Sequence, residues 1–298
     1  MDKIIQIDIV IPCYNVEKVI GKCVESLSSQ VYPRNKYHCY FINDASTDRT
    51  GEILDGFNND EYITVIHHKK NLGLSSTRNT GIKMCNADFI AFLDGDMTVE
   101  NDWLESFLPY FKKNTIAVMG DNIPPNDIKL NPVEKYYFGK LRGARQFNDG
   151  DYISFEYMLY GNAMIRRSVL LECGLFDEKI ISYGGEDTDL SVRIFDISPN
   201  CFIFSKKSNS VHYHRRTLKQ FCLSMETYGK FNLPVLIKKY PHHKIKFGAG
   251  WISSIKGYFL FNFIIFRIIK MIYCFFPLQM FVKYMVVRSV IIGARNSK

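Results

Sequence analysis

Several features are scarce in this sequence of 298 residues. Its eight cysteines contain no Cys-x-x-Cys pair and no regular spacing, which argues against structural zinc or a disulfide framework and favours a reducing cytosol. No apolar run reaches the ~18 residues typical of a membrane-spanning helix. The start, Met1 to Asp8, lacks the apolar stretch of a signal peptide, so export by that route is not expected. With 47% hydrophobic and 23% charged residues, the composition is that of a globular protein.

Acidic residues are almost absent from the last third of the chain. Residues 200–298 contain 17 Lys and Arg but one acid, Glu226, whereas residues 1–199 contain 21 Lys and Arg and 29 acids. Such a basic segment generally meets an anionic partner, either nucleic acid or an anionic membrane surface. Because its charges alternate with runs of Phe, Ile, Tyr and Val and no nucleic-acid recognition motif is present, we predict a membrane surface and no nucleic acid.

Residues 251–293 leave three arrangements open. If this stretch began as one helix, Lys256, Arg267 and Lys270 would form a basic stripe on an apolar cylinder. That pattern favours amphipathic helices lying in the plane of the membrane interface. A spanning hairpin with snorkelling charges and a soluble oligomerisation surface are the alternatives. Pro277 is expected to separate the first helix from a second one.

Residues 1–120 alternate short β-rich apolar runs with amphipathic stretches, which predicts an α/β fold with a mostly parallel sheet. The expected strands lie near residues 7–12, 38–43, 62–67, 88–93 and 115–120. The expected helices lie near residues 16–29, 49–57, 74–85 and 101–111. Asn15, and either Ser46 or Thr47, are placed to cap the first two helices.

Polar residues follow three of these strands: Tyr14-Asn15, Asn43-Asp44 and Asp94-Gly95-Asp96. Ligands of open α/β sheets bind at the carboxyl ends of the strands, so three such loops predict a nucleotide-sized site. Carboxylates on a rigid strand end suit Mg²⁺ or Mn²⁺, which would stabilise charge on a diphosphate leaving group. The alternative is a simple polar turn.

A second acidic cluster, Glu186-Asp187, follows Gly184-Gly185 and supplies a candidate general base for an acceptor hydroxyl. The alternative for this cluster is an acidic helix N-terminus, which is favourable in itself. That alternative also applies to Asp189.

Four segments occur in a fixed order: residues 9–15 (IVIPCYN), 42–48 (INDASTD), 71–81 (NLGLSSTRNTG) and 92–96 (FLDGD). With the segments GLFDE at 174–178 and GEDTDL at 185–190, this series resembles the family 2 glycosyltransferases, inverting enzymes with a GT-A fold. The resemblance covers roughly residues 7–216.

The resemblance implies roles for several residues. On the donor side, Pro12, Tyr14 and Asn15 would meet the nucleotide, Asp44 the uracil N3–H, Arg78 the diphosphate, and Asp94 the donor sugar and ribose. The metal ligand would be Asp96, with His212 at the position where the family often places a ligating His and His214 as a second candidate. On the acceptor side, Asp187 would be the general base and Glu186 would position the acceptor. Arg78 could instead only pair with an acid, and Arg215 and Arg216 could meet phosphate, anionic lipid or solvent.

We therefore predict a GT-A fold with a Rossmann-like, mostly parallel sheet and C-terminal amphipathic, membrane-associated helices. A donor subdomain is expected at 1–120, an acceptor and catalytic-base subdomain at 121–220, and a membrane-associating helical tail at 221–298. The expected activity is Mn²⁺- or Mg²⁺-dependent, inverting transfer from a nucleotide sugar, expected to be a UDP-sugar, to a hydroxyl of a glycan acceptor. A polyprenyl-diphosphate-linked acceptor at the cytoplasmic membrane face is expected, whereas the oligomeric state stays open. The alternatives are a polyprenyl-phosphate sugar synthase and a non-catalytic nucleotide-sugar-binding protein.

Overall fold

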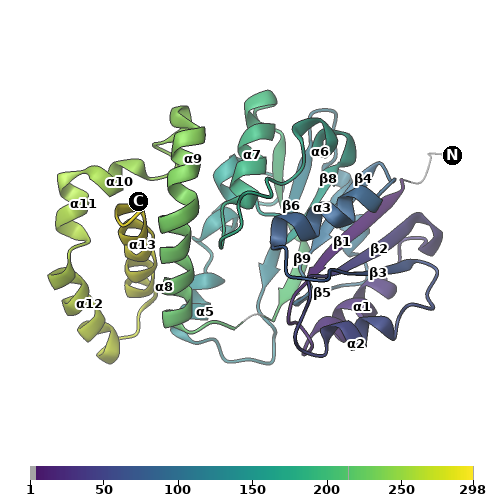
Figure 1. Ribbon diagram of the computed structural model, residues 1–298, viewed down its shortest axis with the longest axis horizontal. Coiled ribbons are helices and arrows are strands. Elements are labelled where there is room, and N and C mark those ends of the chain that lie inside the picture. Colours follow the sequence, from purple (N-terminus) through teal and green to yellow (C-terminus); the bar gives the residue numbers. More distant parts are fainter. Residues whose placement is uncertain (1–4, 214, 298) are drawn as a thin grey trace. The chain divides into compact units, whose positions relative to one another are not determined.

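The computed structural model describes residues 5–213 and 215–297. The chain divides into two units (Figure 1). The first unit contains residues 1–126, 143–181 and 186–214, and the second contains residues 127–142, 182–185 and 215–298.

A mixed sheet forms the centre of the first unit. Over the described residues it has nine strands: β1 (Ile7–Cys13), β2 (Tyr37–Asn43), β3 (Ile63–His67), β4 (Phe89–Leu93), β5 (Met97–Val99), β6 (Ala117–Ile123), β7 (Tyr152–Ile153), β8 (Asn162–Arg166) and β9 (Phe202–His212). Their order is β3-β2-β1-β4-β8-β6-β9-β5, and β7 pairs with β9. β3, β2, β1 and β4 are parallel neighbours, whereas β8 is antiparallel to both β4 and β6. The first four predicted strands are confirmed to within one residue at each end.

Helices cover both faces of this sheet. The helices of the first unit are α1 (Ile20–Ser28), α2 (Thr50–Asp55), α3 (Leu74–Met84), α4 (Trp103–Phe107), α6 (Arg167–Cys173) and α7 (Glu186–Ile197). Short 3-10 turns are η1 (Arg34–Lys36), η2 (Leu108–Tyr110), η3 (Gly143–Gln146) and η4 (Phe155–Tyr157). Ile9 and Ile11 of β1 pack into one core with α1, α2 and α4, because alternate strand residues share a face. Helix α3 lies on the other face (Figure 1). It packs against Val10 so closely that a Cβ on Gly81 would come within 2.5 Å of Val10 Cγ1.

The predicted helix caps are wrong. α1 begins at Ile20, and α2 begins at Thr50 without a capping side chain. Asn15 adopts a positive φ of 53°, a conformation that Asn tolerates better than most residues. Its side chain accepts a hydrogen bond from the Thr47 N–H at 2.8 Å, and its own N–H donates to the Ser46 hydroxyl at 3.0 Å. These polar residues therefore join the loops after β1 and β2 instead of starting helices.

The second unit is helical. Its elements are α5 (Pro132–Tyr137), α8 (Leu218–Thr227), the π-helical turn η5 (Tyr228–Asn232), α9 (Leu233–Lys239), η6 (Pro241–His243), α10 (Ala249–Ser253), α11 (Ile255–Leu260), α12 (Phe263–Phe275) and α13 (Gln279–Arg295). Val133, Phe221, Val282 and Val286 form a core shared by α5, α8 and α13. Among residues 5–213 and 215–297, none of the helices combines the length and apolarity needed to cross a membrane.

The prediction of one helix through residues 256–270 is wrong. Asn262 caps α12 by accepting a hydrogen bond from the Ile265 N–H at 2.9 Å. Lys256 therefore lies on α11, whereas Arg267 and Lys270 lie on α12. The predicted break at Pro277 is confirmed, because α12 ends at Phe275 and α13 begins at Gln279.

Candidate active site

The loops that follow β1, β2 and β4 meet at one edge of the sheet, as predicted. The Pro12 carbonyl accepts a hydrogen bond from the Gly95 N–H at 3.3 Å, and the Cys13 carbonyl accepts one from the Asp44 N–H at 2.9 Å. Tyr14 is half exposed beside these contacts. The strand ends thus form a continuous polar rim on a buried apolar base.

Asp44 is buried in this rim and is held by its own unit. Its Oδ1 accepts hydrogen bonds from the Leu72 N–H at 2.9 Å and lies 2.7 Å from Nδ1 of His68, while its Oδ2 accepts from the Gly73 N–H at 2.9 Å. Each carboxylate oxygen has two lone pairs, so Oδ2 can accept a further bond. The carboxylate therefore fixes the loop before α3 and keeps a lone pair for one more hydrogen bond.

Asp94 stands at the end of β4 in a tight environment. Its N–H donates to the Gly161 carbonyl at 2.9 Å. A Cβ on Gly161 would come within 2.5 Å of Asp94 Oδ2, and a Cβ on Gly95 would come within 3.1 Å of the Pro12 carbonyl. The two glycines therefore allow the close backbone approach that places this carboxylate.

Arg78 connects the two acidic clusters. Its side chain, on α3, is only 1% exposed. Nη1 donates to Asp187 Oδ1 at 2.7 Å and Nη2 donates to Asp94 Oδ1 at 3.2 Å, while the guanidinium lies 5.2 Å from the centre of the Phe176 ring. Burial alone would lower the pKa of Arg78, but the charges of Asp187 and Asp94 raise the pKa above its ordinary value. Arg78 therefore pairs with two acids, and its predicted place near the diphosphate stays a prediction.

Asp187 and Glu186 open α7. Asp187 Oδ2 also accepts from the Tyr160 N–H at 3.2 Å, so both of its oxygens are oriented. Burial, followed by the neighbouring charge of Asp187, raises the pKa of Glu186 from its ordinary 4.5 to about 7. Asp187 faces the charge of Arg78, and the burial of Glu186 brings the pKa of that carboxyl group close to neutral.

Replacing Glu186 by glutamine should raise stability above pH 7. A carboxyl group whose folded pKa lies above its unfolded pKa loses stabilising free energy as the pH rises from about 4.5 to about 7. Glu186→Gln removes that loss, so its stability advantage should grow over this window to about 1–3 kcal/mol and then stay constant. Urea unfolding at a series of pH values measures it. The same change at Glu25, an exposed residue of α1, should give a flat difference, and a flat profile for Glu186→Gln would contradict the raised pKa.

Asp96 and His212, the two predicted metal ligands, lie together. β5 and β9 pair antiparallel, which brings His212 Nε2 to 3.3 Å from Asp96 Oδ2. A carboxylate oxygen beside an imidazole nitrogen fits a divalent cation, and this mixed pair suits Mn²⁺ better than Mg²⁺, which prefers oxygen alone. His214, the second candidate, lies outside the described residues.

Three residues that fix loops escaped the sequence analysis. His68 pairs with Asp44, and Gly161 leaves the space that Asp94 fills. Asn232, buried in the second unit, donates its side-chain amide to the carbonyls of Ser182 and Gly184 at 2.9 and 2.5 Å. Asn232 thereby fixes residues 182–185 within the second unit. None of the three has a local sequence signal, since each acts on residues distant in the chain.

Other candidates have structural partners. Asp189 is fully buried and pairs with Arg193, in agreement with a role in the helix. Arg215 forms an ion pair at 2.7 Å with Glu134, the residue that completes the capping box of α5. Arg216 stacks on the Tyr183 ring at 5.2 Å. The two arginines are therefore engaged by the second unit itself.

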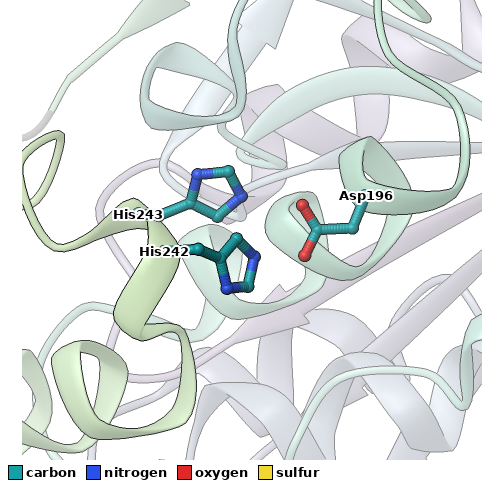
Figure 2. Close-up of side chains that lie close together, drawn as sticks. All are labelled: Asp196, His242 and His243. Atoms are coloured by element: carbon teal, nitrogen blue, oxygen red, sulfur yellow. The ribbon is translucent and has the colours of Figure 1, made fainter.

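His242 and His243 of η6 have ring centres 4.2 Å apart and are drawn in Figure 2 with Asp196 of α7. Asp196 belongs to the first unit and the two histidines to the second, and we assign the three residues no joint role.

The sequence and the fold are similar to those of known proteins. The glycosyl transferase family 2 model matches residues 8–174, more than half of the chain. PcManGT, a mannosyltransferase from Pyrobaculum calidifontis solved with GDP-Man and Mn²⁺, is 14% identical and superposes with a TM-score of 0.68 over 98% of this chain and 86% of its own. TarS 1-349 from S. aureus, solved with UDP, is 15% identical with a TM-score of 0.57 over 97% of this chain and 89% of its own.

The mixed sheet with its covering helices thus has a GT-A fold, as predicted. The chain belongs to glycosyl transferase family 2. The glycosyltransferase GlyA from Streptococcus pneumoniae is 24% identical over 225 residues, 72% of this chain but 32% of GlyA. The chain spans about a third of the length of the first curated relatives that it matches.

Proposed function

We propose that the protein is a metal-dependent, inverting glycosyltransferase that uses a nucleotide-diphosphate sugar. One observation carries the proposal: the buried guanidinium of Arg78 bonds both Asp94, on the donor side, and Asp187, on the acceptor side. A transferase must bring these two sides within bonding distance of one reacting carbon. A polar turn and an acidic helix end, the alternative interpretations, would not require a shared buried cation.

The nucleotide is proposed to lie over the rim formed by Pro12, Tyr14, Asn15 and Asp44. The remaining lone pair on Asp44 Oδ2 could accept the N3–H of uracil, which favours a UDP-sugar. TarS, solved with UDP, supports this choice by analogy of fold, whereas PcManGT was solved with GDP-Man. The donor sugar would then lie near Asp94.

A divalent cation would be held by Asp96 and His212, with its remaining positions open to diphosphate and water. Such a cation supplies Lewis-acid stabilisation of the charge that develops on the leaving diphosphate. This chain's contribution is to hold Asp96, directly before β5, beside His212, at the end of the paired strand β9.

Asp187 is proposed as the general base. The acceptor oxygen forms a bond to the anomeric carbon, the bond from that carbon to the diphosphate oxygen breaks, and the hydroxyl proton passes to Asp187. Arg78 and the Tyr160 N–H hold the carboxylate in place. Glu186, with its raised pKa, can carry a proton and position the acceptor through a hydrogen bond. Attack opposite the leaving group inverts the anomeric centre.

The acceptor is proposed to be a glycan hydroxyl on a polyprenyl-diphosphate carrier at the cytoplasmic face of an anionic membrane. The basic and apolar C-terminal sequence supports this location, since Lys and Arg complement anionic headgroups and apolar side chains enter the interface. The location and the acceptor are separate from the chemistry of the donor site.

Calorimetric titration with UDP, GDP and dTDP, each with and without Mn²⁺, tests the donor site. We expect UDP to bind, and Mn²⁺ to tighten its binding about tenfold or more, because a cation held by Asp96 and His212 would add attraction for the diphosphate. Asp96→Ala should remove the Mn²⁺ dependence, whereas Asp102→Ala, at an exposed position before α4, should not. If none of the three diphosphates bound, the proposed function would be wrong.

A further inference from the structure

The outer half of α12 is apolar although it is not covered. Five partly buried side chains form the inner half: Ile265, Phe266, Ile269, Ile272 and Tyr273. Five apolar side chains of the outer half are between 48% and 75% exposed: Phe263, Ile264, Ile268, Met271 and Phe275. A surface helix normally carries polar residues on its outer face, so a contiguous apolar patch of this kind indicates a binding surface.

The preceding helix extends this patch. Tyr258 and Phe259 of α11 are 57% and 72% exposed. Three exposed cations alternate with these apolar residues along the sequence: Lys256 of α11, and Arg267 and Lys270 of α12. We call these two helices, with their exposed apolar and basic side chains, the α11–α12 surface.

The basic charge of the α11–α12 surface indicates which kind of partner binds it. Glu226 is the last acid in the chain, so residues 227–298 carry only basic charge. A protein partner would have to supply both a large apolar area and several acids, whereas an anionic bilayer supplies both at once. We propose that the α11–α12 surface docks onto an anionic lipid surface, its aromatic and aliphatic side chains entering the interface and its Lys and Arg meeting lipid phosphates. This proposal rests on the membrane location in the proposed function, and it names the surface that makes the membrane contact. It does not depend on the proposed chemistry of the donor site.

Helix α13 holds the α11–α12 surface in place. Arg288 of α13 stacks on Phe266 of α12 at 4.1 Å and donates to the Phe261 carbonyl at 3.2 Å. α13 also supplies Val282 and Val286 to the core of the second unit. Truncating the C-terminus would therefore remove core residues along with the surface, and point variants of the intact chain are the proper test.

The sequence offers an internal probe. Of its two tryptophans, Trp103 is 1% exposed in the core of the first unit, whereas Trp251 is 48% exposed on α10, which leads into α11. Full-length protein is mixed with vesicles of phosphatidylcholine alone or of phosphatidylcholine and phosphatidylglycerol in equal parts. Sedimentation gives the bound fraction, and the emission of Trp251 should shift to shorter wavelength on binding. Trp251→Phe assigns that shift.

Three variants separate the contributions. Phe263→Ser with Phe275→Ser should weaken binding about tenfold or more by removing apolar contact. Lys256→Gln, Arg267→Gln and Lys270→Gln together should weaken binding to the anionic vesicles about 100-fold. Ile181→Ser, at a residue 78% exposed in the first unit, is the matched control and should bind as wild type. All variants should retain UDP binding, which reports a folded donor site.

Each outcome is decisive. Binding to anionic vesicles that weakens at high salt and in both surface variants supports the proposal. Absence of vesicle binding, equal binding to neutral vesicles, or wild-type binding by both surface variants would overturn it. Dimerisation that disappears in Phe263→Ser/Phe275→Ser, without vesicle binding, would assign the surface to a second copy. Vesicle binding without UDP binding would contradict the proposed function, whereas the proposal for the α11–α12 surface would stand.

Discussion

Asp187→Asn should reduce sugar transfer by about 10²–10⁴-fold, while the affinity for UDP stays within about twofold of wild type. The amide keeps the size of the side chain, and its oxygen can still accept from Arg78 at the position of Oδ1, whereas its NH2 group, at the position of Oδ2, loses the bond from the Tyr160 N–H. It cannot take a proton from the acceptor hydroxyl. The loss should therefore appear in kcat and not in donor binding, because the interaction removed is one that the transition state alone requires.

The control for this prediction is Asp102→Asn, an exposed residue before α4, which should transfer at the wild-type rate. UDP release from UDP-sugars, measured with a lipid-linked acceptor, provides the readout. Undiminished transfer by Asp187→Asn would contradict a general-base role and favour an acceptor that is already anionic, such as a polyprenyl phosphate. A parallel loss of UDP binding would instead indicate that the amide disturbs Arg78.

The sequence predicted the parallel half of the sheet because its signals are local. β1 to β4 are short apolar runs of β-branched and aromatic residues, each bounded by polar turns, so periodicity alone locates them. The two acidic clusters could also be identified as site candidates, since their spacing and the motifs around them resemble those of a known family. The helix caps were wrong because Asn15 and Ser46 bond each other across two loops, and a cap rule considers one loop at a time.

The parts that the sequence could not predict depend on long-range contacts. The Arg78–Asp187 bond joins residues 109 positions apart, and the role of Gly161 appears only when β8 lies beside β4. Asn232 acts on a segment about fifty residues earlier. The break at Asn262 was missed because its neighbours continue an apolar pattern, and only the cap bond to Ile265 reveals the start of α12.

Arg78→Met should destabilise the protein by about 3–5 kcal/mol at neutral pH. Arg78 is the buried cation between Asp94 and Asp187, whose side chains are 33% and 11% exposed, and methionine fills its volume without its charge. The two carboxylates would then face each other without compensation, which costs more than the lost hydrogen bonds. Urea unfolding measures this loss. The deficit should shrink on acidification, because burial raises the pKa of Asp94 and protonation of that carboxylate removes part of the uncompensated charge.

Two further variants determine whether charge is the cause. Arg49→Met, which breaks an exposed pair with Glu52, should leave the unfolding free energy unchanged, because solvent already screens that pair. Arg78→Met combined with Asp187→Asn should recover part of the loss, since one of the stranded carboxylates is then neutral. If the double variant were no more stable than Arg78→Met, packing and not charge would explain the effect. Arg78 would then stabilise the site only by filling volume. The proposal that its charge links the donor side to the acceptor side would be wrong.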